Sequence, residues 1–426
     1  MSTSTPLEDL ARSVSGLGVE LADLDTHGLA ERLLALERVV RRAEAAVVAV
    51  LDEADQRGSW KADGHASVRG WARSTVRWSD VEVRDRVRTV RLVRDAPLVA
   101  EELAEGRIGV AQVRELARAR ANPRVGAQIT DAIPLLVEHA EHLPFTEFRI
   151  CVNRWESLAD VDGTHRSHEE AHAGRSAQAA MLGNTFHFNA QGGALDGAAM
   201  MEILARFEQA QFEAEWADLR LRFGDDACPA MMERSAGQRR FDALRAIFEQ
   251  AASTRPGVTP PEPVLNLLMD AELYDAWLRR LTGEDADGPL PDPADVDRRR
   301  CETLDGTRLD PVAVVAVSFA GSVRRVVMGA PGVVIDLGRK RRLFTGSARE
   351  AAKLQGSRCS WPGCGRPRTQ IDHTIGWAAG GPTDPANSGP MCDRHNLVKN
   401  LGFTVWRDEF GRWHVSRPNG TEIAAA

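Results

Sequence analysis

The feature that most constrains this chain is a set of four metal-ligand side chains near its C-terminus. Cys359 and Cys364 form a first pair, and Cys392 and His395 form a second pair further along. The first pair brackets the tripeptide WPG, a turn-forming sequence that can fold two thiolates toward one ion. The i,i+3 spacing of the second pair puts both side chains on one face of a helix. Thiolate and imidazole ligands suit tetrahedral Zn²⁺, and four protein ligands leave no position for water, so the sequence predicts a structural zinc site.

Between and beside the two pairs lies a second group of polar residues. Asp372 and His373 are adjacent, Asn387 follows a GGP turn, and Asn396 comes directly after the fourth zinc ligand. His373 suits a general base, because an imidazole with a pKa near ~6.5 accepts a proton from water at neutral pH. Asp372 offers the oxygen ligand that Mg²⁺ or Mn²⁺ prefers, and Asn387 is expected to orient the imidazole through its Nδ1 proton.

This part of the chain resembles the HNH, or ββα-metal, nuclease module. More closely, the chain resembles the actinobacterial family of HNH-signature proteins that carry a long helical N-terminal domain of unknown function. The resemblance is strong at the C-terminus and looser before residue 180. The stretches that carry it are GRKRRLFTGSAREAAKL, CSWPGC, the DH pair, GGPT, Asn387, CDRHNLVK and the tail GFTVWRDEFGRWHVSRPNG, with GWARSTVRWSDVEVRDRVRTVRLV and GQRRFDALRAIFEQA upstream.

The resemblance implies a metal-dependent endonuclease that hydrolyses DNA phosphodiester bonds. It implies that His373 is the general base, that Asn387 orients it, and that Asp372 and Asn396 hold the catalytic Mg²⁺ or Mn²⁺. Many HNH modules carry a second His where this chain has Asn396. An amide oxygen still binds Mg²⁺, although it is a poorer ligand than imidazole for Zn²⁺, Ni²⁺ or Co²⁺. The departure leaves an alternative open: a decayed nuclease that is a zinc-stabilised, non-catalytic DNA-binding module.

Basic residues are concentrated in the same part of the chain. Residues 337–400 contain eleven Lys or Arg and four Asp or Glu, a formal +7, whereas the whole chain carries −7. Because phosphate binding needs a local excess of positive charge, DNA is the expected partner of this segment, with no predicted base preference. The residues expected to bind nucleic acid are Arg339, Lys340, Arg341, Arg342, Arg366, Arg368 and Lys399.

The sequence upstream predicts mainly helices. Apolar residues between Leu29 and Val50 recur at three- and four-residue spacing, which predicts a long amphipathic helix. Ser79 and Glu82 form a capping box ahead of a second periodic run, and a shorter helix is expected over Val110 to Arg120. Further helices are expected near 196–222 and 237–252.

Other upstream segments predict loops and strands. We expect a polar loop over 161–176, a strand over 181–190, and two strands in 311–336, VAVVAVSF and VRRVVMGAPGVVI. The polar loop contains His168 and His172 in the HExxH pattern of zinc peptidases, a rival interpretation. That chemistry needs a mainly apolar helix and a third ligand, which the polar flanks do not favour.

The predicted fold is a mainly α N-terminal region with a small α+β C-terminal ββα-metal domain stapled by zinc. We expect a helical domain over 1–255, a linker with short strands over 256–345, and the nuclease domain over 346–426. The helical region is a candidate for binding a protein partner or for self-association. The chain has no apolar run of membrane-spanning length and no layout typical of a secretory signal, so we expect a cytoplasmic protein without membrane contact.

Overall fold

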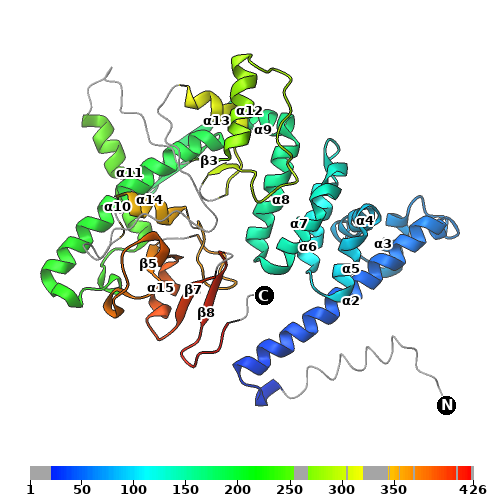
Figure 1. The fold of residues 1–426 in the computed structure, drawn as a ribbon, viewed down its shortest axis with the longest axis horizontal. Helices are drawn as coiled ribbons and strands as arrows, with labels where there is room; N and C mark the ends of the chain where they lie inside the picture. Colours follow the sequence, from blue (N-terminus) through cyan, green and yellow to red (C-terminus); the bar gives the residue numbers. More distant parts are fainter. Residues whose placement is uncertain are drawn as a thin grey trace. The chain divides into compact units, whose positions relative to one another are not determined.

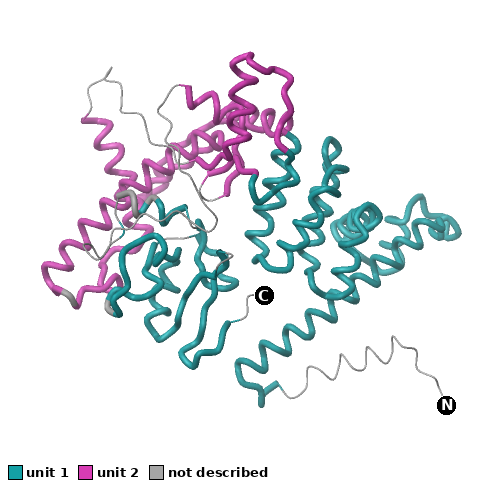
Figure 2. Tube along the Cα trace, in the orientation of Figure 1, with its two compact units in different colours: residues 1–160, 292–298, 328–426 teal, residues 161–291, 299–327 magenta. Residues whose placement is uncertain are grey.

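The computed structural model describes residues 21–253, 267–303, 306–319, 344, 346–354, 356–367, 370–408 and 411–423. These residues are mainly helical, with two-stranded antiparallel sheets, two of them in the C-terminal region (Figure 1). They fall into two compact units, one within 1–160, 292–298 and 328–426 and the other within 161–291 and 299–327 (Figure 2). The division into 1–255, 256–345 and 346–426 stays a prediction.

The N-terminal helices pack around a buried apolar core. Trp155 and Phe148 lie at its centre with none of their surface exposed. Ser79 and Glu82 form the predicted capping box, with the Ser79 hydroxyl accepting from Glu82 N–H and the Glu82 carboxylate accepting from Ser79 N–H. The helices are α2 (Thr26–Arg57), α3 (Val68–Val76), α4 (Asp80–Asp95), α5 (Pro97–Glu105), α6 (Val110–Arg120), α7 (Ile129–His142) and α8 (Phe145–Ala159).

The predicted long helix is present as α2, but its N-terminal apolar stripe is not buried. Leu33 is 69% exposed and Val40 is 53% exposed, whereas the buried residues of α2 are Val48, Leu51 and Ala54. Periodic spacing therefore identified the helix and not the extent of its buried face. Asp25 caps its N-terminus by accepting a hydrogen bond from Gly28 N–H.

The second unit combines helices with two small antiparallel sheets, the hairpin β1–β2 and the pair β3–β4, whose strands are separated by α12. It contains an ion pair between His165 and Asp310, 2.7 Å apart, and one between Arg299 and Asp270, 2.9 Å apart. The predicted helices near 196–222 and 237–252 are confirmed as α10 and α11. Its elements are α9 (Val161–Ala173), β1 (Ser176–Leu182), β2 (Thr185–Gln191), α10 (Ala194–Phe223), α11 (Ala236–Ser253), β3 (Leu267–Met269), α12 (Ala271–Thr282), β4 (Cys301–Thr303) and α13 (Pro311–Ser318).

Three predictions in this unit are wrong. The segment over 161–176 is mostly helix α9 and not a loop, although α9 buries none of its residues. The single strand over 181–190 is a hairpin, because Gly183, at a φ of 60°, makes a tight turn between Leu182 and Thr185. VAVVAVSF is helix α13, where Asp310 caps the N-terminus and Pro311 occupies the first turn. VRRVVMGAPGVVI lies outside the described residues.

The C-terminal region carries two antiparallel hairpins and two short helices, drawn in orange and red in Figure 1. Strands β5 and β6 pair so that Asp372 lies opposite Gly389 and His373 opposite Ser388. The C-terminal tail contains the antiparallel pair β7 and β8. The elements are α14 (Gly346–Lys353), β5 (Gln370–His373), β6 (Ser388–Met391), α15 (Asp393–Lys399), β7 (Thr404–Arg407) and β8 (Trp413–Ser416).

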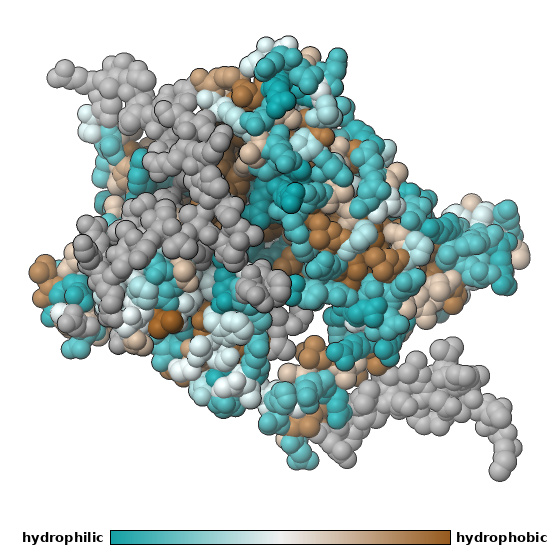
Figure 3. All heavy atoms as spheres, in the orientation of Figure 1, coloured by the Kyte–Doolittle hydropathy of each residue, from teal (hydrophilic) through white to brown (hydrophobic). Residues whose placement is uncertain are grey.

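The described helices give no sign of a membrane span: none combines the length and the apolar character needed to cross a bilayer. On the face drawn in Figure 3, hydrophobic side chains form scattered patches among hydrophilic ones. Single exposed apolar residues of this kind are common on protein surfaces.

Candidate functional site

The first pair of cysteines sits on a tight turn that points both thiols the same way. The backbone N–H of Cys364 donates to the carbonyl of Trp361 at 3.0 Å, and that of Cys359 donates to the carbonyl of Arg366 at 3.0 Å. Gly363, at a φ of 69°, supplies the left-handed residue that closes the turn. The predicted turn is therefore present and brings Cys359 and Cys364 together.

The second pair comes from the start of α15. Cys392 is the residue before the helix, and His395 follows within its first turn. The thiol of Cys392 lies 3.4 Å from the Nδ1 atom of His395. The i,i+3 relationship predicted from the sequence is therefore present.

The four side chains form a cluster of tetrahedral size. The Cys359 thiol lies 3.4 Å from Nδ1 of His395, and the thiols of Cys364 and Cys392 are 3.9 Å apart. All four ligand atoms lie within 4.8 Å of one another. Bond lengths of about 2.3 Å to sulfur and about 2.0 Å to nitrogen place tetrahedral Zn²⁺ ligands roughly 3.5 to 3.8 Å apart. The residues present therefore fit a metal ion bound by three sulfurs and one nitrogen.

Burial makes a cation necessary for thiolate formation here. Desolvation raises the pKa of the Cys359 thiol to about 12, so without a metal ion this thiol stays protonated at neutral pH. Burial also lowers the pKa of His395, and the charges of Arg394 and Arg366 lower it further. The imidazole is thereby kept in its neutral, metal-binding form.

Aromatic packing fixes the orientation of the histidine ligand. The Trp361 ring stacks on the His395 ring with centroids 4.5 Å apart and planes 6° apart, and it also contacts Phe403 at 5.1 Å. Trp361 therefore belongs to the small core around the cluster.

His373 lies at the end of β5 in an enclosed position. Its Nε2 atom is 2.8 Å from the hydroxyl of Thr383, which is fully buried, and the imidazole itself is 6% exposed. The ring packs against Phe344 and Trp377, with centroids 4.8 Å and 5.7 Å away. These three neighbours set the direction of the imidazole.

Asn387 does not hold the imidazole directly, which corrects the sequence prediction. Its side-chain oxygen accepts from the Thr374 hydroxyl at 2.7 Å and from Ile375 N–H at 2.8 Å. Its side-chain nitrogen donates to the carbonyls of Ile375 at 3.1 Å and Pro382 at 2.8 Å. Since both N–H groups are committed to the loop between β5 and β6, Asn387 positions His373 only through the backbone of that loop.

The loop also requires glycine at one point. A Cβ atom at Gly381 would lie 1.9 Å from the carbonyl oxygen of Ile375, so any side chain would displace the backbone. The predicted GGP turn is therefore a close approach of the chain to itself, held by Asn387 from the other side.

Lys399 is buried, which corrects its predicted role on a DNA-binding surface. It is 8% exposed, and its Nζ atom donates to the Asp372 carboxylate at 2.5 Å and to the backbone carbonyl of His373. A buried ammonium group needs such partners because it has lost its hydration. Lys399 therefore joins α15 to β5.

Asn396 also contributes to the contact between α15 and β5. Its side-chain nitrogen donates to the side-chain oxygen of Gln370. Gln370 and Asp372 share one face of β5, and Asn396 and Lys399 share one face of α15, so the two contacts are neighbours. Among the described residues, the side-chain oxygen of Asn396 has no hydrogen-bond donor, and the Asp372 side chain is 26% exposed. Oxygen atoms of this kind fit a hard divalent cation.

Comparison with known proteins places the helical part of the chain in a family. Residues 30–266 match the family described as "Domain of unknown function (DUF222)". That range is more than half of the 426 residues. The chain belongs to the DUF222 family.

The DUF222 range ends well before the cysteine cluster, so the cluster lies outside the matched region. An uncharacterized protein of Mycobacterium tuberculosis (strain ATCC 25618 / H37Rv), Rv3776, is similar to this chain, with 29% identity over 212 residues. The match covers 45% of this chain and 38% of Rv3776, so it spans less than half of that relative. No solved structure matches the chain.

The predicted phosphate-binding residues lie beyond the DUF222 range, and the structure describes only some of them. Arg366 is exposed beside the cysteine cluster, as is Arg394. Arg368 and the run Arg339 to Arg342 lie outside the described residues, so their role stays a prediction.

The residues around His373 could not be identified from the sequence. Thr383 was visible in the GGPT motif, but nothing in its spacing indicated a contact with the imidazole. Phe344 carried no local signal, because it meets His373 only through the tertiary fold.

Among the residues that the structure describes, the HExxH pattern, which lies within the DUF222 range, gathers no third ligand. His168 and His172 lie on α9, a helix with no buried residues. Within the described ranges, the Cys359–His395 cluster is the one group of three or more His, Cys, Asp or Glu side chains close enough to hold a metal ion. The peptidase interpretation therefore gains no support.

Proposed function

We propose that this chain is a metal-dependent HNH endonuclease that hydrolyses DNA phosphodiester bonds, with a structural Zn²⁺ in its C-terminal ββα-metal module. The observation that carries the proposal is the pair of side-chain contacts between α15 and β5, Asn396 with Gln370 and Lys399 with Asp372. Through these contacts, the strand that carries Asp372 and His373 packs against the helix that carries Asn396. The ligands of the Cys359–His395 cluster come before this strand and at the start of this helix.

In this proposal His373 accepts the proton of the attacking water. In the tautomer that donates from Nε2 to Thr383, the lone pair is on Nδ1, and Nδ1 takes the proton. The water oxygen forms a bond to phosphorus as the bond from phosphorus to the 3′ oxygen breaks, giving a 5′-phosphate and a 3′-hydroxyl. Asn387 and Gly381 hold the loop that positions His373, so they act on orientation and not on the proton.

Asp372 and Asn396 are the residues that would hold the catalytic Mg²⁺ or Mn²⁺. When bound, such an ion supplies positive charge to the leaving oxygen and polarises the phosphate. Asp372 also binds Lys399, so Lys399 balances the carboxylate charge in the absence of the ion.

A second candidate function has its own support. His373 is 6% exposed, and the Asp372 carboxylate already has a cationic partner in Lys399. Both features suit a decayed module in which zinc holds a fold that binds DNA without cutting it. Arg366 and Arg394, exposed beside the cluster, serve phosphate contact in either case.

A plasmid-nicking assay separates the two functions. Supercoiled DNA is incubated with the purified full chain and Mg²⁺ or Mn²⁺, with EDTA as the control, and the relaxed form is measured over time. The nuclease proposal expects relaxation that requires the divalent ion. DNA binding without relaxation under any divalent ion would favour the non-catalytic module.

A further inference from the structure

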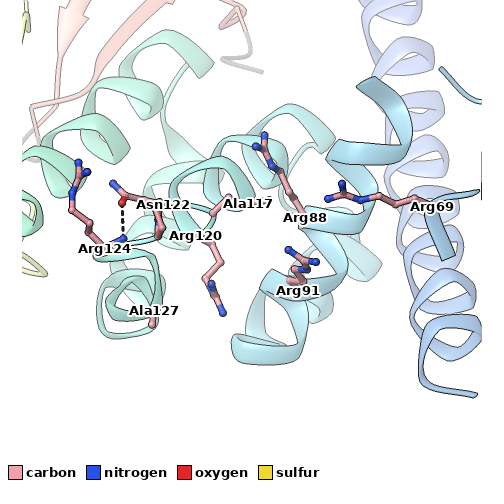
Figure 4. Close-up of a pocket in the computed structure, with 10 residues that line it drawn as sticks. Arg69, Arg88, Arg91, Ala117, Arg120, Asn122, Arg124 and Ala127 are labelled. Atoms are coloured by element: carbon pink, nitrogen blue, oxygen red, sulfur yellow. Dashed lines mark hydrogen bonds between the residues drawn. The ribbon is translucent and has the colours of Figure 1, made fainter. Parts of the chain in front are cut away.

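A basic hollow in the helical part has no role in the function proposed above. The hollow has a volume of about 330 Å³ and is lined by five arginines and no acidic residue (Figure 4). Arg69 comes from α3, Arg88 and Arg91 from α4, Arg120 from the end of α6, and Arg124 from the loop that follows. Such a concentration of guanidinium groups in one concave surface is the electrostatic pattern of an anion site.

Two of the five arginines are neutralised by carboxylates. Arg120 pairs with Asp95 at 2.5 Å, and Arg124 pairs with Asp160 through contacts of 2.7 Å and 2.9 Å. Within the part of the chain that the structure describes, Arg69, Arg88 and Arg91 have no acidic partner. The hollow therefore holds three uncompensated positive charges.

Acidic partners are common elsewhere on the same helices. Four other arginines of α3 and α4 pair with acidic residues, so the lack of acids at the hollow is local and not a property of the whole surface. These pairs are Arg73 with Asp80, Arg84 with Asp85, Arg86 with Glu44, and Arg94 with Asp52 and Asp55.

The three uncompensated arginines line the same hollow. In Figure 4 the Arg69 side chain extends from α3 toward α4, the helix that carries Arg88 and Arg91. Like charges held close repel one another, and a phosphate group relieves the repulsion by accepting paired hydrogen bonds from the planar guanidinium forks. Phosphate is therefore the chemical group that this hollow fits.

The setting favours a strand of phosphates over one small ligand. A second hollow of about 140 Å³ borders the first and shares Arg69 and Arg91 with it. Arg69 and Arg91 are exposed, whereas a site for a small molecule encloses most of its ligand. The second hollow adds no further arginine, and its one acidic residue, Asp55, is paired with Arg94 at 2.9 Å. Two exposed arginines shared by adjoining hollows suit an extended chain of phosphates.

We propose that the hollow formed by Arg69, Arg88 and Arg91 binds the sugar-phosphate backbone of a nucleic-acid strand. The contact is sequence-independent, because phosphates carry no base information. It gives the helical part of the chain a nucleic-acid surface of its own, whether or not the C-terminal module cleaves DNA.

The test compares two triple variants of the full chain that remove the same charge. One carries Arg69→Gln, Arg88→Gln and Arg91→Gln. The control carries the same change at Arg42, Arg73 and Arg84, three exposed arginines outside the hollow. Binding of a fluorescein-labelled 20-nucleotide DNA is followed by anisotropy at several salt concentrations, without divalent ions.

The proposal expects the hollow variant to lose at least tenfold in affinity and the control less than threefold. The slope of log affinity against log salt should fall by about 2 to 3 in the hollow variant, since each lost phosphate contact removes roughly 0.7 to 0.9. Equal losses in the two variants would overturn the proposal, because net charge alone would then account for them. Circular dichroism checks the fold, and the single change Arg91→Glu at an exposed position replaces the triple variant if it misfolds.

A competition arm identifies the source of the phosphate. Inorganic phosphate and a nucleoside monophosphate are titrated against the bound oligonucleotide. The strand proposal expects displacement only at concentrations at least a hundredfold above that of unlabelled 20-nucleotide DNA. Displacement by the monophosphate as readily as by the oligonucleotide would overturn the strand and mark the hollow as a small-ligand site.

Discussion

The Nζ atom of Lys399 lies 2.5 Å from the Oδ2 atom of Asp372, and the two side chains link α15 to β5. Lys399 also donates to the carbonyl of His373, the proposed base. We propose that the same Asp372 carboxylate binds the catalytic cation. Lys399 and that cation are therefore competing partners of Asp372, and the link between helix and strand depends on which one Asp372 engages.

Replacing Lys399 should loosen the module and increase its response to divalent ions. Lys399→Met keeps the side-chain volume but removes the charge, and we expect a loss of about 1 to 3 kcal/mol, discounted because Asp372 is 26% exposed. The temperature of zinc release, followed with a metal-binding dye, should fall, and Mg²⁺ should restore more stability to the variant than to the parent. Lys61→Met, at an exposed lysine of the helical part, is the control. Identical release temperatures for parent and Lys399→Met would contradict this account.

Zinc content should depend on the Cys359–His395 cluster and not on cysteines outside it. The purified protein should hold about one Zn²⁺ per chain, because the described residues contain one S₃N cluster. Cys359→Ser or Cys392→Ser should lose the ion and the structure of the C-terminal module, with little change in helical circular dichroism. Cys228→Ser, at a cysteine outside the cluster, should keep the ion. Absence of zinc from protein prepared without chelators would remove the basis of the proposed module.

Thr383 should matter through its hydroxyl group. Its Oγ1 atom is 2.8 Å from Nε2 of His373, so it selects the tautomer and direction of the base. Thr383→Val keeps the shape but loses the hydroxyl, and nicking should fall about tenfold or more, since positioned acid–base catalysis contributes roughly 10² to 10⁴. Thr383→Ser restores the hydroxyl and should recover most of the rate, with zinc content unchanged in both. Equal rates for the Val and Ser variants would show that the hydroxyl does not position His373.

His414 should make the stability of the C-terminal hairpin depend on pH. Burial acts to lower the pKa of His414, but its hydrogen bonds to Glu422 and Asp408 outweigh this, so the pKa is raised above its ordinary value. A raised pKa in the folded state stabilises the fold below the unfolded-state pKa of about 6.5, and this contribution is lost as pH rises through the folded-state value. His414→Gln should therefore cost more stability at pH 5.5 than at pH 9. An NMR titration that places the His414 pKa below 6 would contradict the assignment.

Local signals in the sequence predicted several parts of the structure well. The capping box at Ser79 and the helix over Val110 to Arg120 depend on neighbouring residues, and both are present. The four ligands of the cysteine cluster were predicted because a turn and an i,i+3 spacing are also local features. Cys392 and His395 lie at the start of α15.

Features that depend on tertiary packing were not predictable in this way. Periodicity predicted that Leu33 faces a core, but its side chain is 69% exposed among the described residues. The run VAVVAVSF has the β-branched composition of a strand, yet capping by Asp310 and Pro311 makes it a helix. Lys399 was counted as a surface charge, because its burial against Asp372 follows from contacts between residues far apart in the sequence.

The most direct test of the central claim is the nicking rate of His373→Ala. The imidazole belongs neither to the zinc cluster nor to the proposed phosphate contacts, so zinc content and DNA affinity should stay close to those of the parent. The rate of Mg²⁺-dependent nicking should fall by a factor of about 100 or more, the contribution of a positioned general base. Nicking by His373→Ala at the parent rate would contradict the account and assign any cleavage to another site or another protein.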